Sequence, residues 1–94
     1  MAKLKVYRGS ADGRNIYCVA ASSRSAVIEA FAAIGIPLKM HDLASHWSVT
    51  GNPTQIEAAM NEPGTVFASR GWGDRDYRPL RSHDDVVALR RSAA

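Results

Sequence analysis

The side chains best suited to bind a partner are concentrated in residues 69–81, whose sequence is SRGWGDRDYRPLR. The segment holds four arginines and two aromatic residues: Arg70, Arg75, Arg78, Arg81, Trp72 and Tyr77. Guanidinium groups bind phosphates or carboxylates through paired hydrogen bonds, and aromatic rings stack on bases or fill a partner's pocket. Asp74 and Asp76 oppose two of the four positive charges, so few phosphate contacts are expected. Three interpretations remain open: a protein interface, a nucleic-acid contact, or a connection whose aromatic residues pack onto the fold.

No residue pattern predicts a metal site or a catalytic centre. His41 and His46 are five residues apart, which is not the spacing of a two-histidine zinc helix, and the chain has one cysteine. Cys18 alternates with apolar residues in a predicted strand, where a cysteine usually acts as a small hydrophobic residue. No serine lies in a glycine-flanked elbow, and no phosphate-binding glycine loop is present. We therefore expect no cofactor, no metal and no enzymatic activity.

A helix-turn-helix is an alternative for residues 23–47, where Gly35 would lie in the turn. The second helix of that motif, residues 38–47, would offer Lys39 as its one cation beside Asp42. Base-reading helices normally present Arg, Lys, Asn or Gln to the base edges. An ordinary pair of packed helices explains the same residues and is favoured.

The totals indicate one small globular domain. Ninety-four residues, 46% of them hydrophobic, are enough for a modest core without disulfides. The net charge is +3. Residues 1–69 contain six Lys/Arg and five Asp/Glu, and residues 70–94 contain six Arg and four Asp, so two of the three surplus charges lie in the last quarter of the chain. The single cysteine favours a reducing compartment, and no leader or membrane span is evident, so a cytoplasmic location is expected. Size and layout are similar to those of small accessory proteins of bacteria, phages and plasmids.

Local patterns predict six or seven elements. Alternation in residues 3–7 and 15–21 predicts a β-hairpin around Asp12-Gly13. A helix should begin at Ser22 or Ser23 and end at Gly35, followed by a shorter helix over residues 38–47. The remaining elements are a third helix with Asn52 as N-cap and Gln55 in a capping box, a strand over residues 65–69, and a last helix or frayed tail within residues 82–94.

The order β-β-α-(α)-α-β predicts an α+β fold in which a small antiparallel sheet carries its helices on one face. The strand at residues 65–69 should pair with the hairpin. Lys3, Lys5 and Tyr7 share one side of the first strand, which is expected to stay open to water. Together with the arginine segment they form the predicted partner-binding surface. The preferred partner is a protein with an acidic patch, the alternative is nucleic acid, no membrane is involved, and an unpaired hairpin edge could form a homodimer.

Overall fold

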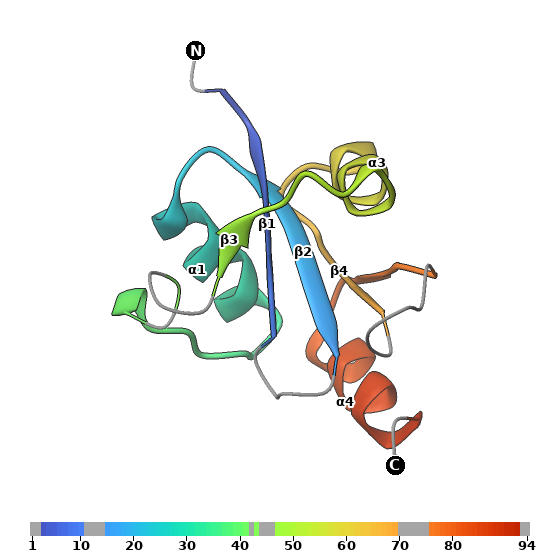
Figure 1. Cartoon of the computed structure of the whole chain (residues 1–94). Helices are drawn as coiled ribbons and strands as arrows, with labels where there is room; N and C mark the ends of the chain where they lie inside the picture. The colour runs from blue at the N-terminus through green and yellow to red at the C-terminus, as the bar shows by residue number, and fades with distance from the viewer. Residues whose placement is uncertain (1–2, 11–14, 42, 44–46, 70–75, 93–94) are drawn as a thin grey trace.

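The structure is a computed structural model that describes residues 3–10, 15–41, 43, 47–69 and 76–92. A five-stranded antiparallel sheet has the order β3-β1-β2-β4-β5, and three helices pack against it (Figure 1). The strands are β1 (Lys5–Gly9), β2 (Ile16–Ala21), β3 (Ser48–Val49), β4 (Val66–Ser69) and β5 (Arg78–Leu80), and the helices are α1 (Arg24–Ala33), α3 (Pro53–Asn61) and α4 (His83–Ser92). The predicted α+β class with a small antiparallel sheet is confirmed.

The hairpin is formed as predicted, with Lys5 opposite Ala21 and Gly9 opposite Tyr17. β4 pairs with β2 on its free side, which confirms that the strand after the third helix joins the hairpin. The other edge of the hairpin is not unpaired, because β3 adds to β1 through Tyr7 and Arg8. The outer strands of the sheet are therefore β3, with two residues, and β5, with three.

Helices cover both faces of the sheet, so the prediction of a single covered face is wrong. Every residue of β2 is buried. Tyr17, Val19 and Ala21 lie in a larger cluster that includes buried residues of α1 and α4, whereas Cys18 and Ala20 lie in a smaller cluster with Ala59 of α3. Figure 1 shows α1 and α3 on opposite sides of the strands. The sheet is the middle layer of three.

The larger cluster is centred on aromatic side chains. Phe31 of α1 makes edge-to-face contacts with Tyr17 and Trp47, at ring-centroid distances of 5.6 and 5.2 Å. Such pairs contribute beyond the apolar area they bury. Gly9 of β1 lies directly beneath Trp47, and an added Cβ there would overlap the indole ring.

Both ends of α1 follow from its sequence. The Ser23 hydroxyl accepts a hydrogen bond from the backbone N–H of Ala26 at 3.2 Å, as an N-cap does. At the other end the N–H of Ile36 donates to the carbonyl of Phe31, and that of Gly35 donates to Ala32. This is a Schellman motif, and Gly35 adopts the left-handed conformation that it requires, with φ of 81°.

α3 begins as predicted but buries a different face. Asn52 caps it by accepting from the N–H groups of Thr54 and Gln55. Helical spacing would allow Ile56, Ala59 and Met60 to form one apolar stripe, yet only Ala59 of these is buried, and Gln55 is buried beside it. On the helix side the buried contact is made by Ala59, which lies in one cluster with Val6, Cys18, Ala20 and Phe67 of the sheet. The larger apolar residues are left on the outer side.

The C-terminal helix α4 is attached to the sheet by Val86, which is fully buried in the larger cluster. Of the second helix predicted over residues 38–47, the structure describes helical backbone at Met40, His41 and Leu43. Leu43 donates to the carbonyl of Lys39, and Trp47 donates to Leu43, which are helical i to i−4 hydrogen bonds. Among the described residues, no helix has the length and apolar character needed to cross a membrane.

Candidate functional site

In the predicted binding segment the structure describes Ser69 and residues 76–81, which include Tyr77, Arg78 and Arg81 around strand β5. Arg70, Trp72 and Arg75 lie outside the described residues, so their predicted role stays a prediction. We use the name arginine surface for the set predicted in this segment: Arg70, Trp72, Arg75, Tyr77, Arg78 and Arg81.

Tyr77 anchors the arginine surface to α3. Its ring is half-buried against the smaller cluster, and its hydroxyl oxygen accepts a hydrogen bond from the side-chain amide of Gln55 at 2.8 Å. The amide oxygen of Gln55 accepts in turn from the hydroxyl of Thr50 at 2.5 Å. Thr50 also accepts from the backbone N–H of Asn52, which is the group that Gln55 would bind in a capping box. Gln55 is therefore used for a tertiary contact, and Thr50 completes the cap in its place.

Arg78 and Arg81 extend from the end of the sheet into solvent. The Arg78 guanidinium pairs with Asp76 at 3.0 Å, and its side chain is 70% exposed. The Arg81 guanidinium pairs with Glu62 at 2.6 Å, and the Arg81 side chain is 60% exposed. Exposed ion pairs contribute little to stability, because water and salt screen them. Both guanidinium groups can therefore exchange these carboxylates for those of a partner at small cost.

The Arg81 contact also affects the carboxyl group that it binds. The hydrogen bond from Arg81 lowers the pKa of Glu62 below its ordinary value, with a further hydrogen bond from Thr65. The backbone N–H of Arg81 donates to Asp85 at 2.7 Å, in the first turn of α4. Arg81 thus joins the end of α3 to the start of α4.

Lys3, Lys5 and Tyr7 lie in or next to β1, far from Arg78, a described member of the arginine surface. Lys3 and Lys5 are exposed, but Tyr7 is 7% exposed and packs in the larger cluster, so the expectation that this side of β1 is open to water is wrong. From the strand register, Lys5 is three strands and about four residue levels from Arg78. At about 4.8 Å per strand and 3.3 Å per residue, their Cα atoms are roughly 20 Å apart.

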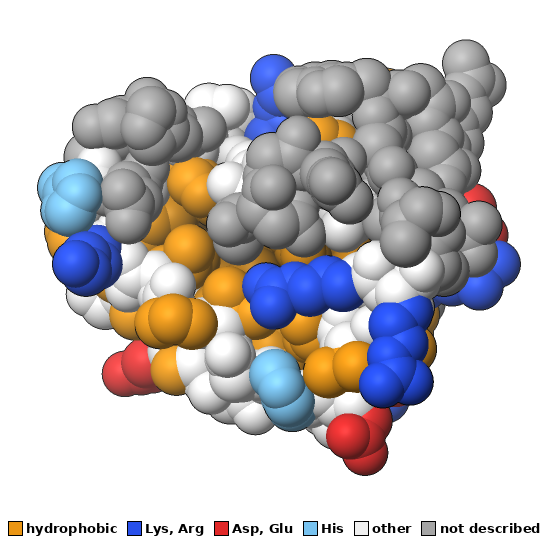
Figure 2. Space-filling view, turned by 90° about the horizontal axis from the view of Figure 1, so that it is seen from below, with side chains coloured by type: hydrophobic (Ala, Val, Ile, Leu, Met, Phe, Trp, Pro, Cys, Tyr) orange, Lys and Arg blue, Asp and Glu red, His pale blue; other side chains and the backbone are white. Residues whose placement is uncertain are grey.

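The Lys and Arg side chains do not form one continuous stripe on the face in Figure 2, where those described are dispersed between patches of hydrophobic side chains. A dedicated nucleic-acid-binding domain typically gathers its cations on one face. On this face the described cations fit individual contacts better than a long phosphate track.

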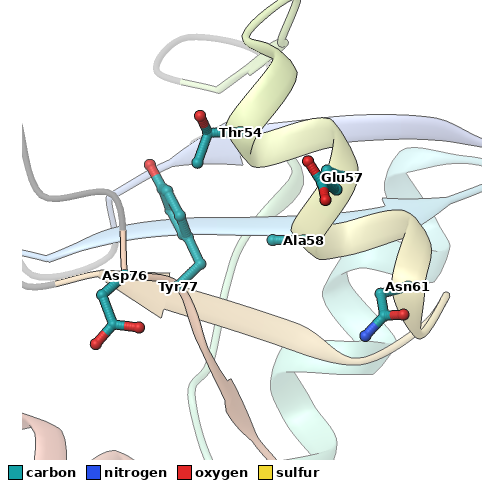
Figure 3. A pocket seen from close by; sticks show the side chains of 6 residues that line it. All are labelled: Thr54, Glu57, Ala58, Asn61, Asp76 and Tyr77. Carbon is teal, nitrogen blue, oxygen red and sulfur yellow. The ribbon is translucent and has the colours of Figure 1, made fainter.

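A polar groove lies beside Tyr77, between α3 and the start of β5 (Figure 3). Its volume is about 430 Å³, and its lining consists of Thr54, Glu57, Ala58, Asn61, Asp76 and Tyr77. Figure 3 shows Tyr77, the residue before β5, directed toward α3, with Glu57 and Asn61 projecting from the helix. This groove was not predicted from the sequence. The spacing of Thr54, Glu57 and Asn61 at i, i+3 and i+7 was the available signal, since it places polar side chains on one side of a helix.

Among the described residues, the titratable side chains that could bind a metal or act in catalysis do not lie close together. Within the part of the chain that the structure describes, no three His, Cys, Asp or Glu residues are grouped as metal ligands. The His83 ring lies 3.2 Å from the carbonyl of Ile34 at the end of α1, while His41 is exposed on the short helical turn. Cys18 is buried, which raises its pKa to about 12, and its thiol donates to the backbone carbonyl of Gln55 at 3.8 Å. A thiol held in its neutral form is a poor nucleophile.

Comparison of the chain with protein-family models, curated proteins and solved structures found no match.

Proposed function

We propose that the protein is a non-enzymatic binding protein that acts on another protein through the arginine surface, as an accessory or inhibitor protein. The observation that carries the proposal is that a tyrosine held in place by the fold lies next to two exposed arginine side chains. Tyr77 is held by Gln55 and by apolar packing, while Arg78 and Arg81 extend from it and pair only with exposed carboxylates among the described residues. A preorganised base lowers the entropic cost of presenting long side chains to a partner.

The proposed partner is a protein with an acidic patch in a reducing, cytoplasmic setting. Arginine is enriched among residues that dominate binding energy, and its planar fork matches carboxylates. Asp76 and Glu62 partly neutralise the two arginines, which reduces attraction to a uniformly charged phosphate backbone more than to a partner with a few placed carboxylates. Lys3 and Lys5 can take part as well, because an interface of about 800 Å² per partner is roughly 30 Å across.

The experiment is site-specific photo-crosslinking in the native host. A photoreactive amino acid at position 78 should crosslink one defined protein, whereas the same amino acid at position 29, on α1, should not. Glu29 is a matched control because it is exposed and lies in a different layer of the fold. An identical set of products at both positions would show that the arginine surface has no specific partner.

Nucleic acid is the alternative partner, and the same surplus of arginines supports it. The test is fluorescence anisotropy with labelled single-stranded and duplex DNA at about 50 and 200 mM salt. Nucleic-acid binding predicts measurable affinity at low salt, a steep loss at high salt, and weaker binding of Arg78→Ala. No binding at the lower salt concentration excludes this alternative.

A further inference from the structure

An apolar pocket lies where the end of α1 meets the start of β4 and the end of β5. Its volume is about 260 Å³, and its floor is formed by the buried side chains of Ile34, Val66 and Leu80. Val66 and Leu80 lie opposite each other in the β4–β5 ladder, and Ile34 is the C-cap residue of α1. Backbone hydrogen bonds therefore hold the floor in place, and the pocket is formed before anything binds in it.

Small side chains on α1 keep this pocket open. Ala30 and Ala33 line it, and their spacing of three residues places both on one side of the helix. Ala33 is exposed, so a larger side chain at that position would fill the pocket without displacing a core residue. An apolar cavity of about 150 Å³ is large enough for benzene. The pocket thus has room for one side chain the size of leucine.

Arg81 lies at the rim of the pocket and is the one charged residue among the described residues that line it. Among the described residues, its guanidinium makes a single contact, from Nη1 to Glu62. The N–H groups of Nε and Nη2 can therefore donate to a carbonyl oxygen while the ion pair with Glu62 stays in place. A charged side chain inserted into the pocket would lose water over an apolar floor, which is unfavourable.

We infer that this pocket binds one leucine-sized apolar side chain of the protein that binds the arginine surface, and that Arg81 donates to the backbone carbonyl beside that side chain. The choice of occupant follows from the apolar floor, the volume and the two unused donors, and it does not depend on net charge. Arg81 belongs both to the pocket and to the arginine surface, so the two are continuous. The inference rests on the proposed function and deepens it: the acidic patch of the partner should include an exposed apolar residue, because large side chains buried in pockets dominate binding energy at interfaces.

The pocket itself is tested with N-acetyl-leucine methylamide, which carries the side chain and a backbone carbonyl, in a proton–nitrogen-15 NMR titration. The probe should shift the amide signals of Ala33, Thr65 and Leu80 with a dissociation constant on the order of 1–10 mM. N-acetyl-alanine methylamide should bind at least about tenfold more weakly. Ala33→Phe should abolish binding of the leucine probe, and Ala33→Met should weaken it if the Phe variant does not fold. The matched control Ala32→Phe, at an exposed position on another side of α1, should leave it unchanged. Equal binding of the two probes, or equal effects of the variants at positions 32 and 33, would overturn the inference.

The role of the pocket in partner binding is tested by isothermal titration calorimetry with the protein crosslinked at position 78. Ala33→Phe should weaken its affinity at least about tenfold, and Ala32→Phe should change it less than about twofold. If Arg78→Glu/Arg81→Glu weakens binding and Ala33→Phe does not, the inference is wrong and the proposed function stands. If neither variant weakens binding, both are wrong.

Discussion

Replacement of Gln55 tests how the arginine surface is held to the rest of the fold. Gln55 is 4% exposed and is the middle member of a chain of hydrogen bonds from Thr50 to Tyr77. We expect Gln55→Leu, which keeps the side-chain volume close to that of glutamine, to destabilise the protein by about 2–3 kcal/mol. Two lost hydrogen bonds contribute about 1 kcal/mol each, and the buried Thr50 hydroxyl loses its acceptor, which adds a desolvation cost of up to about 1 kcal/mol.

The assay is urea unfolding at 25 °C followed by circular dichroism, with the slope of the free energy against urea held equal to that of the wild-type chain. For a domain of this size, the expected loss lowers the midpoint of thermal unfolding by roughly 10–20 °C. Tyr77→Phe removes one of the two hydrogen bonds and should cost about 1 kcal/mol. In the double variant the two losses should overlap by about 1 kcal/mol, because they share one hydrogen bond.

The refuting result is specific. If Gln55→Leu costs less than about 0.5 kcal/mol, or if its effect and that of Tyr77→Phe simply add, then the hydrogen bond between these residues does not fix Tyr77. The base of the arginine surface would then be set by apolar packing alone.

Three further predictions concern other parts of the molecule. Gly9→Ala should destabilise the fold by about 2 kcal/mol or more, because the new methyl group would overlap the indole ring of Trp47. The control Gly51→Ala has open space around the new methyl group, so its free energy of unfolding in urea should change by less than about 0.5 kcal/mol. Burial raises the pKa of Cys18 from 9.0 to about 12, so the unfolded chain loses the thiol proton at lower pH than the folded chain does. The free energy of unfolding should therefore fall between pH 9 and 12, and it should fall less steeply in the Cys18→Ala variant. Parallel pH profiles of the two chains would contradict the burial of the thiol. The pKa of Glu62 is below its ordinary value of 4.5 in the folded chain, so its ionised carboxylate stabilises the fold above pH 4.5, and that stabilisation is lost as the pH falls through the folded pKa. Arg81→Gln should raise the pKa of Glu62 in a carbon-13 NMR titration. An unchanged pKa would disprove the contact.

The sequence predicted best those elements whose ends are marked by local chemistry. Ser23, Gly35 and Asn52 act on neighbouring backbone groups, so their effect does not depend on the rest of the chain. The strands β3 and β5 were missed for the opposite reason. Two residues cannot show an alternation, and Pro79 in the middle of β5 argues against a strand except at the edge of a sheet, where β5 lies.

The number of covered faces was predictable from β2, whose sequence IYCVAA contains no charged residue at either side of the alternation. A strand that is apolar on both sides indicates burial on both sides. That signal was outweighed by the regular charge alternation of Lys3 and Lys5 in the neighbouring strand. Because of this error Tyr7, which is buried in the core, was predicted to lie on an open surface.

The candidate site was predictable only in part. The sequence singled out Tyr77, Arg78 and Arg81, but not the contact from Tyr77 to Gln55, which joins residues 22 positions apart. A glutamine at the third position of a helix predicts a capping box, in which its side chain binds the N-cap backbone. In the structure the Gln55 side chain binds Tyr77 instead, because β5 lies beside α3. The groove was missed for the same reason, since its two walls come from different elements.

The most direct test of the proposed function is the affinity for the protein captured by crosslinking at position 78, measured by isothermal titration calorimetry. The double variant Arg78→Glu/Arg81→Glu should weaken binding by at least about tenfold, because each arginine would present a like charge to an acidic partner. The control Arg24→Glu/Lys39→Glu, which makes the same change in net charge at exposed positions at the start of α1 and after its end, should bind within about twofold of the wild-type chain. Equal losses in the two double variants would contradict a binding role for the arginine surface.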